Sequence, residues 1–130
     1  MIKYIAESIG TFLLVAVVVG SGIMAENLSQ GNDAVALLGN TIATGAILFV
    51  IIKMFASISG AHFNPVVSMV FLIRKEIDLK EFINYVIIQI ISGVFAVFII
   101  HFIFNQQQYQ ISTNIRGEWP LLVSEIIATC

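Results

Sequence analysis

The chain has 130 residues, of which 58% are hydrophobic and only 11% are charged, and its mean hydropathy is +0.98. Soluble domains carry about 25% charged residues, and a chain of this length has too small an interior to bury so much apolar surface. We therefore expect an all-α membrane protein that has the lipid bilayer as its solvent. The net charge of −2 excludes the basic surface of a nucleic-acid-binding protein, and the single cysteine excludes an internal disulfide or a cysteine-based metal cluster.

Three segments are long and apolar enough to cross a bilayer, namely residues 4–24, 34–58 and 79–104. Each has at least the roughly 20 residues that cross a hydrocarbon core of about 30 Å. A cleaved signal peptide is the alternative for the first segment, but its length and the carboxylate of Glu7 favour a retained helix. We expect Asp33 to cap the second span and Asp78 to cap the third.

The basic residues predict the orientation. With a cytoplasmic N-terminus, five of them fall on or near the cytoplasmic side: Lys3, Lys53, Arg74, Lys75 and Lys80. Arg116 alone falls outside. Because cytoplasmic segments are enriched in Lys and Arg, we expect a multi-pass protein of the plasma (inner) membrane with its N-terminus in the cytoplasm.

Residues 59–72 do not fit this pattern of spans and loops. They begin and end on the cytoplasmic side, yet the part after Asn64 is too apolar for an open loop. A helix from Asn64 to Leu72 would rise only about 13 Å, so it can enter the bilayer but cannot cross it. We therefore predict a re-entrant segment that has an irregular arm buried in protein or facing a water-filled cavity.

The sequence SGAHFNP at residues 59–65 suits such an arm. Asn64 is a strong helix N-cap, and Pro65 at the first helical position has a preset φ and no N–H group to satisfy. The Asn64 amide would offer donors to a passing neutral solute near the positive end of the short helix. Acceptors would come from the carbonyl groups of Gly60, Ala61, His62 and Phe63. The plainer alternative is an Asn-Pro pair that only starts a short interfacial helix.

The SGAHFNP motif resembles the first signature loop of the aquaporin and glycerol-facilitator (major intrinsic protein) family. Residues 6–12 resemble the start of the family's first helix, and residues 85–93 resemble its third-helix pattern. The resemblance implies an aquaporin-like fold of two inverted repeats, assembled as a homotetramer with one pore per subunit. Residues 1–117 would form the first repeat, with three transmembrane helices and one re-entrant half-helix. Residues 118–130 would be the truncated start of the second repeat, a partial fourth helix.

The resemblance also implies roles for single residues. Glu7 and Glu125, at matching places in the two repeats, would be buried and would hydrogen-bond loop backbone near the pore, with Gln89 as a further support. The alternative for Glu7 is a solvated carboxylate at the membrane interface. Val66 stands where the family's motif has Ala, and its extra methyl groups would alter the pore width. His62 would face the cytoplasmic vestibule, either as a pH-sensitive group or as a packed, hydrogen-bonded loop residue.

Two features bear on the solute. Thr44 falls at the family's outer constriction, where water-selective members carry an aromatic residue, so a threonine implies a wider opening for glycerol-sized neutral solutes. The alternative is that Thr44 bonds the backbone of its own helix. Residues 20–26 and 68–71 resemble bacterial members linked to permeation of trivalent arsenicals, which adds arsenite as a further solute.

These features predict a passive channel for water and small neutral solutes. We expect no enzyme activity, metal or cofactor, because the sequence has no nucleophile–base pair or metal-ligand set. The family's second half-helix and its Asn-Pro-Ala loop are absent from the 130 residues, so we expect the chain to be incomplete. The alternative functions are a non-conducting remnant and a half-channel subunit that needs a separate second half.

Overall fold

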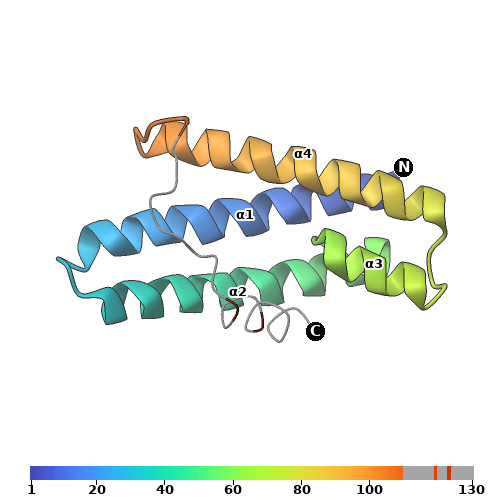
Figure 1. Ribbon diagram of the computed structural model, residues 1–130, viewed down its shortest axis with the longest axis horizontal. Helices are drawn as coiled ribbons and strands as arrows, with labels where there is room; N and C mark the ends of the chain where they lie inside the picture. The colour runs from blue at the N-terminus through green and yellow to red at the C-terminus, as the bar shows by residue number, and fades with distance from the viewer. Residues whose placement is uncertain (110–118, 120–122, 124–130) are drawn as a thin grey trace.

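The computed structural model describes residues 1–109, 119 and 123, and in that part of the chain it has four α-helices (Figure 1). These are α1 (Ile2–Leu28), α2 (Asp33–Ser59), α3 (Pro65–Ile73) and α4 (Leu79–Ile103). Three of them, α1, α2 and α4, are long and apolar enough to cross a membrane. The nine residues of α3 rise only about 13 Å. This set of three spanning helices and one short helix confirms the predicted fold class, while the partial fourth helix predicted for residues 118–130 lies, except for residues 119 and 123, outside the described part of the chain.

Three helices, α2, α3 and α4, begin after a residue whose side chain accepts a hydrogen bond from a backbone N–H group of the first turn. The predicted cap of α4 is confirmed, because Asp78 Oδ1 accepts a hydrogen bond from the N–H of Glu81 at 2.6 Å. The predicted cap of α2 is wrong. Its cap is Asn32, which accepts a hydrogen bond from the N–H of Val35 at 3.2 Å, and Asp33 is the first helical residue. Asn and Asp cap helices about equally well, so the sequence does not distinguish these two neighbours.

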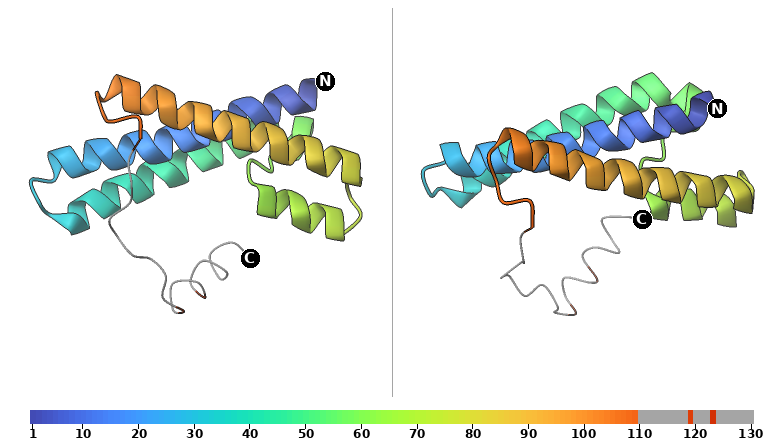
Figure 2. Two further views of the ribbon diagram at one scale, coloured as in Figure 1. Left: turned by 45° about the horizontal axis from the view of Figure 1, so that its top comes forward. Right: turned by 90° about the horizontal axis from the view of Figure 1, so that it is seen from above.

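The central helix of the bundle is α1, which packs against both α2 and α4, while α3 packs against α4 (Figures 1 and 2). The N-terminus, the end of α2, the short helix α3 and the start of α4 all lie at one end of the bundle (Figure 1). The short helix therefore runs beside only part of the length of the spanning helices, near the end that carries the N-terminus.

Small residues let the spanning helices approach one another closely. A Cβ atom added at Gly39 in α2 would lie 3.5 Å from the Cβ of Ala25 in α1. One added at Gly93 in α4 would lie 3.6 Å from Cγ2 of Val15 in α1. Such close approach is how helices associate in lipid, where burying apolar surface against a neighbouring helix gives no hydrophobic gain.

The interior is more polar than the surface. Seven of the buried side chains in the described residues are polar or charged: Glu7, Thr11, Ser59, His62, Ser68, Gln89 and Ser92. Large apolar side chains such as Phe49 and Phe102 are instead 65% and 78% exposed. This distribution suits a surface that lipid covers, because hydrocarbon solvates apolar side chains and leaves polar groups to find partners inside the protein.

The closest approach at any glycine in the described residues occurs where α1 meets the segment between α2 and α3. A Cβ atom added at Gly10 would lie 2.0 Å from Cε1 of Phe63, whose side chain is 4% exposed. No side chain larger than hydrogen fits at Gly10 unless the Phe63 ring moves.

Gly10→Ala should therefore lower the thermal unfolding midpoint in detergent micelles, measured by circular dichroism. The expected loss of stability is about 1–3 kcal/mol, the usual cost of overpacking a filled site. Gly45→Ala is the matched control, because no atom lies within 4 Å of the added Cβ. A Gly10→Ala midpoint equal to that of Gly45→Ala would contradict the contact.

Candidate functional site

The 60–64 loop, which joins α2 to α3, has a backbone with several left-handed residues. Gly60, with a φ of 85°, ends α2 in a conformation that glycine adopts without steric penalty. Ala61 and Phe63 have φ values of 54° and 50°, which cost a residue with a side chain about 1–2 kcal/mol each. Other interactions must therefore hold the loop in this shape.

The side chain of Glu7 reaches from α1 and holds the loop. It is fully buried, and its carboxylate accepts four hydrogen bonds. Oε1 accepts from the Ser59 hydroxyl at 2.7 Å and from the His62 N–H at 2.9 Å. Oε2 accepts from the Phe63 N–H at 2.8 Å and from Nε2 of Gln89 at 2.9 Å. Four donors match the roughly four lone-pair sites of a carboxylate, so its capacity is fully used.

These bonds also decide where the loop carbonyl groups point. The N–H of Ala61 donates to Oγ of Ser59 at 3.2 Å, and the next two N–H groups donate to Glu7. In a trans peptide the preceding carbonyl points opposite to the N–H, and the described chain has no cis bond. The carbonyl oxygens of Gly60, Ala61 and His62 therefore point away from Glu7. Within the described residues, they and the carbonyl oxygen of Phe63 accept no hydrogen bond.

A second set of bonds ties the loop to α4 through Ser68, which is fully buried. Its hydroxyl donates to the Asn64 carbonyl at 3.2 Å and accepts from Nε2 of Gln89 at 3.1 Å. Nδ1 of His62 lies 3.0 Å from the same oxygen. A serine hydroxyl has one hydrogen, so with that hydrogen on the Asn64 carbonyl the His62 Nδ1 is the donor. Tyr85 adds a bond from α4, because its hydroxyl donates to the Ser59 carbonyl at 2.8 Å.

Sequence reasoning did not identify Ser59, Ser68 or Tyr85 as supports of the loop. One signal was available for Ser68, which is the only polar residue in the α3 sequence PVVSMVFLI. A lone hydroxyl in an apolar helix needs a partner when it is buried. The sequence has no comparable signal for Tyr85, because tyrosine is common at membrane interfaces.

His62 is a packed loop residue. Its side chain is 5% exposed, and its ring centroid lies 4.2 Å from that of Phe71 in α3. Burial lowers the pKa of His62 below its ordinary value, and the opposing attraction of the Glu7 charge is smaller. Burial and the single hydrogen bond through Nδ1 both favour the neutral imidazole.

Asn64 and Pro65 start α3 as an N-cap and a first helical residue. The Asn64 amide oxygen accepts from the N–H of Val66 at 2.8 Å. Its amide nitrogen donates to no group in the described part of the chain, so two N–H donors remain available. The Val66 side chain is 47% exposed and lies outside the buried cluster around Glu7.

Two predicted site residues lie outside this cluster. Thr44 is in α2, 15 residues before Ser59 and thus about 22 Å along the helix axis. Its hydroxyl donates to the side chain of Asn40 at 3.4 Å and not to the helix backbone. Glu125 lies outside the residues that the structure describes.

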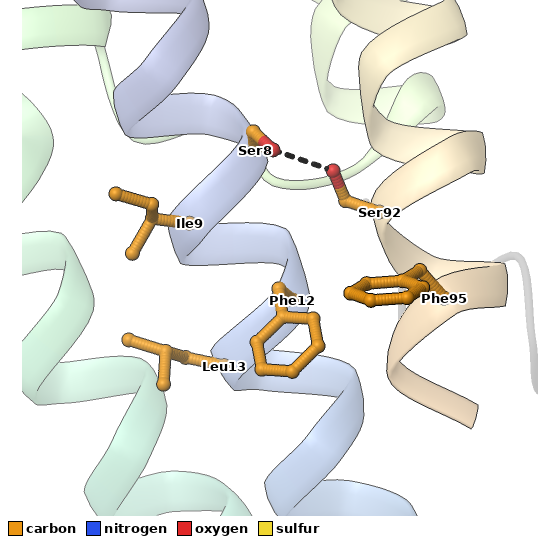
Figure 3. Close-up of a pocket in the computed structure, with 6 residues that line it drawn as sticks. All are labelled: Ser8, Ile9, Phe12, Leu13, Ser92 and Phe95. Carbon is orange, nitrogen blue, oxygen red and sulfur yellow. Dashed lines mark hydrogen bonds between the residues drawn. The ribbon is translucent and has the colours of Figure 1, made fainter. Parts of the chain in front are cut away.

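A pocket of about 300 Å³ lies between α1 and α4 (Figure 3). The oxygens of Ser8 and Ser92 form a hydrogen bond of 2.8 Å across it. The rings of Phe12 and Phe95 lie 5.9 Å apart farther along the two helices. Ile9 and Leu13 complete its lining, and no residue predicted to line a pore takes part.

The chain is similar in sequence to known proteins. The sequence pattern of the family described as "Major intrinsic protein" matches residues 1–130. The chain is 45% identical to an aquaglyceroporin AqpS of Rhizobium meliloti (strain 1021), over 97% of this chain and 54% of the relative. It is 38% identical to a glycerol uptake facilitator protein-like 6 of Lactiplantibacillus plantarum, over 74% and 41% of the two chains. It is 34% identical to a probable aquaporin TIP5-1 of Oryza sativa subsp. japonica, over 77% and 38%.

The chain thus spans about half the length, or less, of the curated relatives that it matches. The family match, by contrast, extends over all 130 residues. Since this match includes the spanning helices, the 60–64 loop and α3, the chain is a membrane protein that belongs to the major intrinsic protein family.

Proposed function

We propose that this chain supplies one wall of a passive channel for water and small uncharged solutes. The observation that carries the proposal is the set of unused hydrogen-bonding groups at the 60–64 loop. Four carbonyl oxygens accept no bond within the described residues, and the amide nitrogen of Asn64 donates none. Such groups can replace the hydrogen bonds that a neutral solute loses when it leaves water.

In this proposal Glu7 and Gln89 act as supports. By attracting the N–H groups of His62 and Phe63, the Glu7 carboxylate turns the loop carbonyls toward the solute path. Gln89 donates to both Glu7 and Ser68 and so joins the supports of the loop and of α3. We propose the same supporting role for Glu125 in the second repeat.

The proposed selectivity excludes cations by two means. The start of α3 at Pro65 carries the positive end of a helix dipole, and the polar groups beside it have no negative charge that faces the path. The carboxylate of Glu7 is buried behind the loop and saturated by donors. A neutral molecule is not repelled by the helix dipole and does not need a negative charge as a partner.

We propose glycerol-sized molecules as solutes in addition to water, with arsenite as a further uncharged candidate. Thr44 is smaller and more polar than an aromatic residue, so it leaves room at the proposed outer constriction. The names of two relatives, an aquaglyceroporin and a glycerol uptake facilitator, support the glycerol part of this proposal.

For the assembly, we propose a homotetramer in the plasma (inner) membrane, with the N-terminus in the cytoplasm and a second repeat that completes each pore. Residues 1–117 would form the first repeat and residues 118–130 would begin the second. The arrangement of the helices supports this orientation. One end of the bundle holds the N-terminus, the end of α2, the short helix α3 and the start of α4 (Figure 1). Lys3, Arg74, Lys75 and Lys80 belong to that end, as the preference for cytoplasmic basic residues requires.

Stopped-flow light scattering of proteoliposomes tests the channel. The samples are the chain alone and the chain joined to the second half of the 45% identical relative. We expect the joined form, at least, to exceed empty vesicles in water and glycerol permeability. Permeability equal to empty vesicles for both forms would contradict the proposed function.

Asn64→Asp should reduce glycerol flux in the conducting form several-fold, because it replaces two N–H donors with a charge that repels the solute's oxygen atoms. Asn27→Asp is the matched control, since Asn27 is exposed near the end of α1. Equal glycerol flux in the Asn64 and Asn27 variants would mean that Asn64 does not line the path.

Glu7→Gln should release the loop, because the amide nitrogen that replaces one carboxylate oxygen cannot accept the bonds made there. At least one buried donor is then left without a partner, which costs about 1–3 kcal/mol. We expect faster hydrogen exchange at the His62 and Phe63 amides, measured by NMR, together with reduced water permeability. Glu26→Gln, at an exposed position on the same helix, is the control. Unchanged exchange at both amides would refute the supporting role.

A further inference from the structure

A polar cluster of Ser21, Asn40 and Thr44 lies between α1 and α2, far from the 60–64 loop. Oδ1 of Asn40 accepts a hydrogen bond from the Thr44 hydroxyl at 3.4 Å and lies 2.8 Å from the Ser21 hydroxyl, whose one hydrogen is shared with the Val17 carbonyl. All three residues are half-buried. We call them the Asn40 cluster.

The hydrogen-bonding capacity of Asn40 is only half used. A side-chain amide has two acceptor sites on its oxygen and two hydrogens on its nitrogen, and the two hydroxyls occupy the oxygen. Nδ2 donates to no group within the described part of the chain. Gly22 of α1 lies beside this nitrogen, since a Cβ atom added there would be in van der Waals contact with Nδ2 at 3.6 Å. The Thr44 oxygen, with its hydrogen directed at Asn40, keeps acceptor sites of its own.

The helix geometry of α1 places this cluster in line with the loop. Ser21 follows Glu7 by 14 residues, which is just under four helical turns. Ser21 therefore lies within about 40° of the direction of Glu7 and about 21 Å along the axis. The 60–64 loop packs on the Glu7 face of α1, so a solute that has passed the loop and follows this face of α1 would reach the Asn40 cluster.

The geometry points to Asn40 as a solute-binding residue: its amide N–H groups, beside the Thr44 oxygen, form a site for a small uncharged molecule with adjacent hydroxyl groups. This inference rests on the proposed function and adds a residue that discriminates between solutes. A hydroxyl group both donates and accepts, so two neighbouring hydroxyls match a donor and an acceptor side by side. A diol can bind each group with a separate hydroxyl, whereas a water molecule must bind both through its one oxygen atom.

Binding is tested with glycerol on the 130-residue chain in deuterated detergent micelles. We expect intermolecular NOEs from the glycerol C–H protons to the Asn40 side-chain amide and to the Thr44 methyl group. The Thr41 methyl group is the internal control, because Thr41 is exposed and donates to the Leu37 carbonyl of its own helix. Absence of NOEs at Asn40 and Thr44, or equal NOEs at Thr41, would overturn the inference whether or not the chain conducts.

The Asn40→Leu variant separates solute binding from helix packing. If Asn40 binds solute, the Thr44 NOE disappears and the ratio of glycerol to water permeability falls about fivefold, the size of one lost hydrogen bond. Thr41→Val should change neither quantity. If Asn40 only joins α1 to α2, the thermal midpoint falls while the Thr44 NOE and the permeability ratio stay as in the wild type, and the inference is wrong. Failure of the proposed function has a different signature, namely wild-type permeability no higher than that of empty vesicles.

Discussion

The structure depends on one buried carboxylate. Glu7 projects from the central helix α1 and accepts hydrogen bonds from the end of α2, from two consecutive N–H groups of the 60–64 loop and from α4. It therefore joins three separate segments at one point. A buried carboxylate without partners would cost far more than a few hydrogen bonds return, so the four donors and the acceptor stabilise one another. The left-handed backbone of Ala61 and Phe63 persists because these bonds hold it.

The same contacts explain why a polar site lies in so apolar a chain. Lipid solvates the outward-facing side chains, and the hydrogen-bonding groups gather where α1, the loop, α3 and α4 meet. Each of the two backbone N–H groups that turn toward Glu7 has, on the opposite side of its peptide, a carbonyl without a partner among the described residues. The support of the loop and the proposed binding of a polar solute thus have one origin, which is the planar trans peptide with its donor and acceptor on opposite edges.

Much of the fold could be predicted from residue patterns. The three long apolar segments are sufficient for spanning helices, because a helix satisfies its own backbone hydrogen bonds in lipid whatever its neighbours are. The start of α3 could likewise be predicted from neighbouring residues, since Asn64 and Pro65 suit the cap and first-turn positions through their own geometry. The cap of α2 could not be predicted in this way, because Asn32 and Asp33 are adjacent residues of nearly equal capping strength.

The sequence by itself determined the membrane setting, the number of spanning helices and the short helix after an Asn-Pro pair. These are properties of segment length, hydropathy and capping, and each acts within a few residues along the chain. Only the tertiary structure decided that Ser59, Ser68 and Tyr85 join Glu7 and Gln89 around the loop, and that Asn40 bonds Ser21 and Thr44. Such bonds join residues as many as 82 positions apart. They depend on the rotation and separation of packed helices, which no local pattern specifies.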